Sequence, residues 1–254
     1  MKLDERAAIV TGGGTGVGRA TALALAARGC SVAVNYSRSK DAAEATAEEV
    51  RGLGVNALAI QADVARDADC RGLVDTAVRG LGRLDVLVQS AGATSIIPHE
   101  KLEDVGEEDW DRILGVNLKG PFQCARAARS ALEVSGGEIV NVSSVAGIVG
   151  TGSSIPYCAS KAALNMVTVT LARALAPRIR VNAVAPGFIT GRWWSESVPT
   201  ELYEAIKQGA ASRSPLQAVC EPEDVSDAIL SILTGSDLVT GQVLVVDGGM
   251  TIGI

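Results

Sequence analysis

A tyrosine and a lysine stand four residues apart in the segment IPYCASKAAL, residues 155–164. On an α-helix, Tyr157 and Lys161 share one face, with Cβ atoms roughly 5–6 Å apart. An ammonium ~5 Å from a phenol stabilises the phenolate by roughly 3 kcal/mol at an effective dielectric of ~20, which lowers the phenol pKa toward neutrality. The pair therefore predicts a general acid/base for a carbonyl or an alcohol. Such a pair is also common on protein surfaces, so other motifs must decide.

A glycine-rich turn, TGGGTGVGRATA at 11–22, follows a predicted strand at 7–11 and opens a predicted helix at 18–29. Gly12, Gly16 and Gly18 give the pattern G-x-x-x-G-x-G. Without Cβ atoms the backbone turns tightly and presents the N–H groups of the helix start to a pyrophosphate. The strand before and the helix after favour a dinucleotide loop over a simple tight turn.

The end of the second predicted strand indicates which dinucleotide binds. An NAD site places an acid there for the ribose 2′-hydroxyl, whereas an NADP site supplies an arginine for the 2′-phosphate. The segment VNYSRSK has no carboxylate side chain between Val34 and Lys40. Ser37 and Arg38 are therefore the candidates for the 2′-phosphate, and NADP(H) is preferred over NAD(H). The alternative is that Arg38 and Lys40 only solvate a helix start.

These residues must be positioned by alternating strands and helices. Short β-branched runs predict strands at 7–11, 31–36, 56–61, 84–89, 137–142, 179–185 and 242–247, with helical patterns between them that end near Gly29 and Gly54. This alternation predicts a single α/β domain over 1–254, a doubly wound parallel sheet of about seven strands. The segment 188–222 is too long for a simple crossover and is predicted to be a substrate lid or specificity insert.

Composition excludes several classes of function. The 254 residues carry a net charge of −6, which gives no electrostatic footprint for nucleic acid or an anionic membrane. Five cysteines form no CxxC pair and no cluster with the single His99, so no metal site or disulfide framework is expected. No stretch approaches the ~18 apolar residues of a membrane span, and no signal peptide is readable. The simplest setting is the cytoplasm.

Seven motifs in one order carry a family resemblance. They are TGGGTGVG at 11–18, DV at 63–64, SAG at 90–92, VNLKG at 116–120, NVSS at 141–144, YCASK at 157–161 and APGFIT at 185–190. In this order they resemble a short-chain dehydrogenase/reductase of the single-domain branch, over essentially the whole chain. The resemblance implies a Rossmann-type fold and a nicotinamide cofactor.

The resemblance also implies a catalytic tetrad of Asn117, Ser144, Tyr157 and Lys161. Of two adjacent serines, Ser144 has the family's spacing of 13 positions before the tyrosine, and Ser143 is expected to make a structural hydrogen bond. In the family the serine holds the substrate oxygen near the tyrosine. The lysine binds the nicotinamide ribose, and the asparagine holds a water that leads from the lysine to solvent.

The implied cofactor contacts begin in the first loop and follow four strand ends. Asp63 accepts from the adenine amino group, and Gly92 lets the adenosine ribose approach. The full set is Gly12, Gly14, Thr15, Gly16, Val17, Gly18, Ser37, Arg38, Asp63, Val64, Ala91, Gly92, Tyr157, Lys161, Pro186, Gly187, Ile189 and Thr190. Gln89 and Ser90 replace two family asparagines, which is expected to alter stability more than activity. Thr15 stands where NADP-preferring members often carry a basic residue, so NAD(H) use stays possible.

The motifs are shared by 3-oxoacyl carrier-protein reductases and by related sugar dehydrogenases. Arg126, Arg129 and Arg173 could meet an acidic carrier protein, but the turn ALEVSGGE at 131–138 lacks the basic residues of such reductases. Trp193 and Trp194 follow the nicotinamide-framing segment and are expected to wall the substrate or to pack the lid onto the body.

Three functions remain open at this point. The leading one is NADPH-dependent reduction of a ketone or 3-oxoacyl compound, and the second is NAD(P)-dependent oxidation of a sugar or another secondary alcohol. The third is a non-catalytic nucleotide sensor. In the family, long helices and the last strand form tetramers or dimers. The segments 120–134 and 159–176 and the apolar end MTIGI at 250–254 predict a homotetramer.

Overall fold

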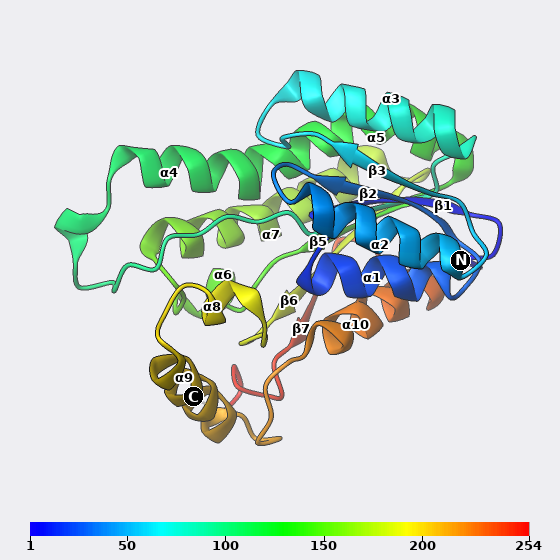
Figure 1. The fold of residues 1–254 in the computed structure, drawn as a ribbon. Coiled ribbons are helices and arrows are strands. Elements are labelled where there is room, and N and C mark those ends of the chain that lie inside the picture. The colour runs from blue at the N-terminus through cyan, green and yellow to red at the C-terminus, as the bar shows by residue number, and fades with distance from the viewer. Residues whose placement is uncertain (254) are drawn as a thin grey trace.

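Short apolar runs form one seven-stranded sheet in which every neighbouring pair of strands is parallel (Figure 1). The computed structural model describes residues 1–253. The sheet order is β3-β2-β1-β4-β5-β6-β7. The strands are β1 (Ala7–Thr11), β2 (Ser31–Tyr36), β3 (Ala57–Gln61), β4 (Val86–Gln89), β5 (Glu138–Val142), β6 (Arg180–Pro186) and β7 (Val243–Val246). The predicted doubly wound parallel sheet is confirmed, with strand bounds that shift by no more than two residues.

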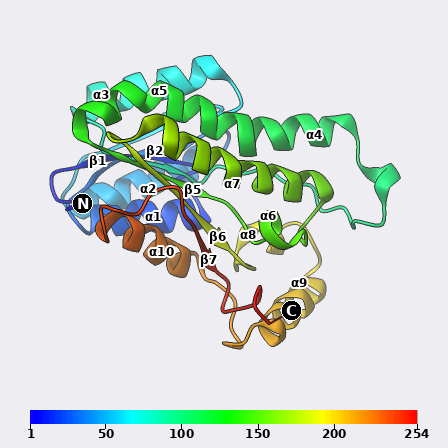
Figure 2. The same ribbon diagram turned by 180° about the vertical axis from the view of Figure 1, so that it is seen from behind.

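Helices cover both faces of the sheet, as Figures 1 and 2 show from opposite sides. One apolar core packs β1 and β2 against α1 (Gly16–Ala26), α2 (Lys40–Gly52) and α10 (Pro222–Thr234). A second core packs the other face against α3 (Asp67–Leu81), α5 (Gly120–Ser135) and α7 (Ile155–Leu175). The remaining helices are η1 (Leu102–Asp104), α4 (Glu107–Leu114), the π-helical turn η2 (Gly115–Lys119), α6 (Ala146–Val149), α8 (Arg192–Ser195) and α9 (Thr200–Arg213). Because both faces are covered, the strands read as apolar runs.

The order of the strands reverses at β1, which pairs with β2 on one side and with β4 on the other. Ligands of open parallel sheets bind beyond the carboxyl ends of the strands at such a point. The two loops that leave β1 and β4 are tied together there, because the Ala91 N–H donates to Thr11 Oγ1 over 3.1 Å. This junction fixes where a dinucleotide site can form.

The segment 188–222 leaves the sheet after β6 and returns before α10. It carries α8 and α9, and a parallel backbone bridge between Ile189 and Cys220 closes its base. Figure 1 shows α9 standing apart from the two helix layers. Its role as a lid stays a prediction.

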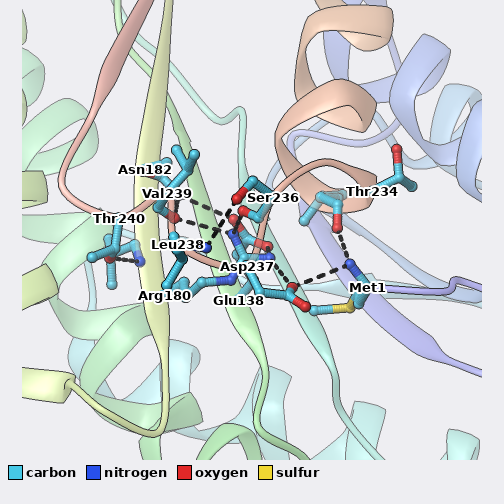
Figure 3. A network of polar contacts seen from close by, with 12 residues as sticks. Met1, Glu138, Arg180, Asn182, Thr234, Ser236, Asp237, Leu238, Val239 and Thr240 are labelled. Carbon is cyan, nitrogen blue, oxygen red and sulfur yellow. Dashed lines mark hydrogen bonds and ion pairs between the residues drawn. The ribbon is translucent and has the colours of Figure 1, made fainter.

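An ion-pair network ties together the amino ends of β5 and β6, at the opposite edge of the sheet from the strand ends that carry the motifs (Figure 3). Glu138 is fully buried, and its Oε2 lies 2.6 Å from an Arg180 nitrogen. Arg180 also pairs with the exposed Asp237 and donates to the Val239 carbonyl. Asn182 Nδ2 donates to Glu138 Oε1 over 3.1 Å. Since burial disfavours the charged carboxylate, the pKa of Glu138 rises to about 7 despite Arg180.

The two glycines expected at helix ends lie just beyond those ends. Gly29 and Gly54 have positive φ, but they lie beyond helix caps at Ala27 and Leu53.

In residues 1–253 no helix combines the length and apolarity that crossing a membrane requires. Of the apolar end at 250–254, Ile254 lies outside the described residues.

Candidate active site

The loop between β1 and α1 brings backbone unusually close to two neighbouring elements. A methyl group at Gly12 would lie 2.9 Å from Ala91 Cα, and Gly12 has a positive φ of 63°. A methyl group at Gly14 would lie 2.9 Å from the Ala43 nitrogen, and one at Gly18 would overlap the Gly12 carbonyl oxygen. Only glycine permits these approaches, which leave a bare cradle of backbone at the helix start. The loop therefore fits a pyrophosphate group.

A cavity of about 810 Å³ runs from this loop across the carboxyl ends of the sheet. It brings together most of the predicted site residues, namely Gly12, Thr15, Gly16, Val17, Ala91, Gly92, Ser144, Tyr157, Lys161, Pro186, Gly187, Ile189, Thr190, Trp193 and Trp194. Seven predicted residues lie outside its lining: Gly14, Gly18, Ser37, Arg38, Asp63, Val64 and Asn117. Gly14 and Gly18 shape the loop from behind.

Tyr157 sits in the first turn of α7, where the sequence itself starts the helix. The buried Ser154 is the N-cap, and its side chain accepts from the Tyr157 N–H over 3.4 Å. Pro156 follows in the first turn, where its missing N–H costs nothing. Burial raises the pKa of the Tyr157 phenol to about 12, and a hydrogen bond with the Ser144 side chain opposes that rise. The phenol is therefore a proton donor at neutral pH.

Lys161 follows one turn later and faces the same cavity. Its ammonium donates to the Val142 carbonyl over 2.8 Å and lies 5.7 Å from the centroid of the Tyr157 ring. Burial lowers the pKa of Lys161 to about 8. The expectation that the phenol pKa falls toward neutrality is wrong, because burial raises it instead. Burial penalises both charged forms, and the ammonium is directed at a backbone carbonyl.

The two adjacent serines after β5 point to different partners. Ser144 Oγ accepts from the Ala146 N–H over 3.1 Å, and the Ser144 side chain is the one that lowers the pKa of the Tyr157 phenol. Ser143 Oγ donates to Asn165 Oδ1 over 2.6 Å, which ties β5 to α7. The serine with a hydroxyl at the phenol is thus Ser144.

Asn117 lies in the π-helical turn between α4 and α5, where the regular helix hydrogen bonds are interrupted. Its side chain is buried. Asn117 Oδ1 accepts from the Ala93 N–H over 2.7 Å, and Asn117 Nδ2 donates to the Ala93 carbonyl over 2.9 Å. It also donates to Ser160 Oγ over 3.0 Å, and Ser160 Oγ donates to the Tyr157 carbonyl. Asn117 thereby joins η2, the loop after β4 and the first turns of α7.

The residues after β2 and β3 lie beside a second hollow of about 460 Å³. Ser37 and Asp63 both line it, and Gln61 donates to the Ser37 carbonyl over 3.1 Å. Arg38 is exposed, and within residues 1–253 no ion pair involves it. Val64 is buried, and its carbonyl accepts from Gln123 over 2.9 Å. Arg38 itself is not part of the lining of this hollow, which includes the carboxylates of Asp63 and Asp69.

The two departures from the family pattern keep the strands braced. Gln89 Nε2 donates to Asn141 Oδ1 over 2.9 Å, and Asn141 Nδ2 donates to Thr168 Oγ1 over 2.9 Å. This buried chain joins β4, β5 and α7. Ser90 lines the cavity beside Ala91. The longer glutamine side chain thus makes a bracing contact that sequence reasoning did not foresee.

The tryptophans after β6 have different surroundings. The ring of Trp193 is 41% exposed, lies 6.1 Å from the Tyr157 ring with an edge-on angle of 64°, and packs on Gly92, where a methyl group would be 3.2 Å away. Trp194 stacks on Phe188 with centroids 5.8 Å apart. Thr190 hydrogen-bonds through its hydroxyl to Glu221. Trp193 therefore lines the cavity beside the Tyr157 ring, while Trp194 is held in an aromatic cluster.

Sequence reasoning missed three charged residues of the cavity: Arg192, Glu196 and Arg213. Their positions depend on how α8 and α9 fold back over the sheet, and no motif marks them. His99 lies outside the cavity lining, and its Nε2 is 3.9 Å from Cys158 Sγ. Among residues 1–253, no group of three His, Cys, Asp or Glu side chains is arranged to hold a metal ion.

Comparisons with known proteins agree with this geometry. A family model described as enoyl-(acyl carrier protein) reductase matches residues 12–251. A Streptomyces violaceoruber protein, provisionally named ketoacyl reductase 2 of the granaticin polyketide synthase, is 44% identical over 243 residues, covering 95% of this chain and 94% of the relative. The 3-oxoacyl-[acyl-carrier-protein] reductase FabG of Staphylococcus aureus is 38% identical over 98% of this chain and 99% of its own. The chain belongs to the short-chain dehydrogenase/reductase family.

Solved structures of the family share the fold over nearly the full length. A Burkholderia xenovorans protein, provisionally described as a short-chain dehydrogenase/reductase, superposes with a TM-score of 0.90 at 36% identity, covering 97% of this chain and 98% of that one. NAD⁺-bound xylitol dehydrogenase gives a TM-score of 0.90 at 29% identity, covering 98% and 100%. As a short-chain dehydrogenase/reductase, the chain is an oxidoreductase of a family that uses nicotinamide cofactors.

Proposed function

We propose that this short-chain dehydrogenase/reductase reduces a ketone or 3-oxoacyl compound to the secondary alcohol with NADPH. One observation carries the proposal: the Ser144 hydroxyl and the Tyr157 phenol line the same cavity, and this cavity continues to the glycine cradle. A carbonyl oxygen placed between these two hydroxyls receives a hydrogen bond from one and a proton from the other. The bound nicotinamide supplies the hydride to the carbonyl carbon.

The protonation states favour the reductive direction. With a pKa of about 12, Tyr157 keeps its proton until the substrate oxygen gains negative charge. Its O–H bond then breaks as the alcohol O–H bond forms, and the phenolate is left beside the Lys161 ammonium. The Lys161 pKa of about 8 leaves this group mostly charged at neutral pH. Lys161 and the polar contacts of Asn117 then provide a route for the next proton, with Lys161 also binding the nicotinamide ribose.

The test of the reaction is Tyr157→Phe, with Tyr203→Phe on α9 as the matched control. Loss of the phenol proton should reduce carbonyl turnover by roughly 10²–10⁴-fold while NADPH binding persists. Tyr203→Phe, which removes a hydroxyl that contacts the Gly191 N–H, should keep turnover. Absence of turnover by the wild type on a broad panel of ketones and secondary alcohols, with either cofactor, would favour the nucleotide sensor instead.

The preference for NADP(H) rests on Ser37 and Arg38. Arg38→Ala should raise the KM for NADPH by about tenfold, the loss of one charge-assisted phosphate contact, and leave the KM for NADH unchanged. An equal rise for both cofactors would contradict 2′-phosphate binding. The second candidate function, NAD(P)-dependent oxidation of a sugar or another secondary alcohol, is favoured by the likeness to NAD⁺-bound xylitol dehydrogenase. Turnover measured on a panel of polyols with NAD⁺ distinguishes this oxidation from the reduction of a carbonyl compound.

Carrier-protein docking has weak electrostatic support in this chain. Arg126 pairs with Asp67, and Arg129 pairs with Glu133 over 2.7 Å, so only Arg173 of the three expected arginines is left to meet an acidic partner. The proposed substrate is therefore a small molecule, with a carrier-bound form as the alternative. Competition between acyl carrier protein and a small 3-oxo ester for turnover separates the two.

We also propose a homotetramer in the cytoplasm. Phe122 and Val134 of α5 and Met166 of α7 are exposed apolar side chains on helices that the family uses for assembly. All five cysteines are unpaired thiols, as a reducing compartment requires. A monomeric mass by light scattering at micromolar concentration contradicts the tetramer.

A further inference from the structure

One face of α9 forms the cavity wall on the side of the 188–222 segment. Ile206, Ala210 and Arg213 all line the cavity, at the i, i+4, i+7 spacing of a single helix face. Seven residues of helix extend about 10 Å. The wall is thus apolar at Ile206 and Ala210, and it ends in a guanidinium group.

Among the described residues, Arg213 differs from the other charged groups of the cavity in having no polar partner for its side chain. The charged lining residues are Lys161, Arg192, Glu196 and Arg213. Lys161 donates to a backbone carbonyl, and Arg192 contacts both carboxylate oxygens of Glu196, at 2.5 and 3.2 Å. Across the described part of the chain, residues 1–253, no ion pair or side-chain hydrogen bond engages the Arg213 guanidinium. Within residues 1–253, this end of the cavity therefore presents a guanidinium that no carboxylate side chain pairs with.

The backbone that presents Arg213 is anchored. The next residue, Ser214, is buried, and its hydroxyl donates to the Gly248 carbonyl over 2.8 Å. This bond ties the end of α9 to the turn after β7, which continues into Met250, another lining residue. A methyl group at Gly187 would lie 3.8 Å from the Met250 terminal carbon. Arg213 thus projects from an anchored backbone and lines the same cavity as Met250 and the segment 186–190.

The charge of the whole chain does not explain a cation here. A net charge of −6 repels anions at long range, so an anionic ligand must be recognised by a local cation. Arginine presents a planar fork of donors that matches a carboxylate or a phosphate. We propose that the carbonyl substrate carries an anionic group, a carboxylate or a phosphate, on an apolar arm, and that Arg213 binds this group. This inference rests on the proposed reductase function.

The experiment compares anionic substrates with neutral partners of the same length. The carboxylate pair is a methyl-ketone carboxylate and its methyl ester, in a series of increasing chain length. The phosphate pair is acetoacetyl-pantetheine with and without its terminal phosphate. Turnover is measured for the wild type, Arg213→Gln, Arg213→Lys and the control Lys207→Gln, which removes one charge on the same helix outside the cavity lining. Arg213 is exposed and Lys207 is half-buried, and glutamine keeps a polar side chain at both positions, so both variants are expected to fold.

The expected result is a KM for the anionic member that rises about tenfold in Arg213→Gln, with the KM of the neutral member unchanged. Arg213→Lys should recover part of the loss, and Lys207→Gln should change neither KM. A response of only one pair identifies the anion as carboxylate or phosphate. The proposal is overturned if wild type does not distinguish the members of either pair, or if Arg213→Gln affects both members equally.

A separate readout keeps this inference distinct from the reductase proposal. If no carbonyl compound is turned over, the oxo carboxylate and its ester are titrated against the intrinsic fluorescence of the cavity tryptophans. Tighter binding of the carboxylate that is lost in Arg213→Gln supports the anion site even without turnover. Equal binding of acid and ester refutes it.

Discussion

Replacing Glu138 with glutamine tests whether burial or Arg180 controls the ionisation of this carboxyl group. Two influences on the Glu138 carboxyl group oppose each other. An Arg180 nitrogen lies 2.6 Å from Glu138 Oε2 and favours the charged form, whereas complete burial disfavours that form. The N-terminal ammonium also favours the charged form, and Asp237 disfavours it. Burial is the largest influence, so the pKa rises from its ordinary value of 4.5 to about 7. Glutamine keeps the shape and removes the titration.

The magnitude follows from linkage between protonation and folding. Between the unfolded pKa of 4.5 and the folded pKa of about 7, the folded protein holds a proton that the unfolded chain has lost. The free energy of unfolding therefore falls as pH rises through this window, by about 3 kcal/mol in total, because each tenfold change in an acid dissociation constant is worth about 1.4 kcal/mol. About 2 kcal/mol of that change lies between about pH 5.5 and about pH 8.5. The lower limit keeps the protein above its isoelectric point of 5.0.

The assay is urea unfolding of wild type and Glu138→Gln at a fixed protein concentration, because assembly contributes to apparent stability. Subtracting the two unfolding free energies at each pH cancels every other titrating group. The variant should gain about 2 kcal/mol relative to wild type from the acid to the alkaline limit. The control is Asp237→Asn, which removes the exposed partner of Arg180 but keeps the Glu138 carboxyl, so its difference from wild type should change by much less than about 2 kcal/mol over the same pH range.

A difference that stays flat or falls with pH refutes this reasoning about Glu138. It would show that Arg180 holds the carboxyl pKa at or below its ordinary value and that the ion pair outweighs burial. A constant offset between the two proteins has no bearing on the result, since only the slope reports the pKa.

Three further predictions concern glycines and the cavity tryptophans. Gly18→Ala should weaken NADPH binding by about tenfold or more, because its methyl group overlaps the Gly12 carbonyl oxygen and reshapes the phosphate cradle; calorimetric titration measures this. Gly72→Ala should raise the free energy of unfolding by about 1 kcal/mol, because this position lies inside α3 with open space around it; urea unfolding measures this. Binding of NADPH is expected to quench the tryptophan fluorescence of the protein. Trp193→Phe should remove most of this quench, because Trp193 packs on both Gly92 and Tyr157.

Each of these has a control within the chain. Gly52→Ala is the control for Gly18→Ala, since Gly52 lies at the end of α2 with open space around it and lines neither hollow, so NADPH binding should stay intact; equal loss in both contradicts the cradle. For Gly72 itself, a loss of stability contradicts the open helical site. Trp194→Phe should keep the quench, because its ring stacks on Phe188 rather than on Tyr157. A quench unaffected by Trp193→Phe contradicts the contact.

Local sequence patterns were sufficient to predict the helix, strands and loop that position the site residues. The four-residue spacing predicted that Tyr157 and Lys161 share one helix face, and Ser154 and Pro156 form the start of that helix in the structure. The strand segments 7–11 and 31–36 were predicted to the residue, because buried parallel strands read as continuous apolar runs. The glycine cradle was predicted from the strand, the turn and the helix that surround it. These features depend on sequence neighbours alone.

Other properties depended on groups distant in the chain, and only the tertiary structure decided them. The sequence predicted a lowered phenol pKa for Tyr157, but enclosure by several elements raises it, since desolvation depends on everything packed around the ring. Gln89 replaces an expected asparagine, and its bond to Asn141 required the register of β4 and β5. Arg213 lies 52 residues beyond Lys161, yet the return of α9 over the sheet places both in one cavity. Sequence periodicity determines which segments fold locally, whereas burial and charge pairing arise only when those segments pack.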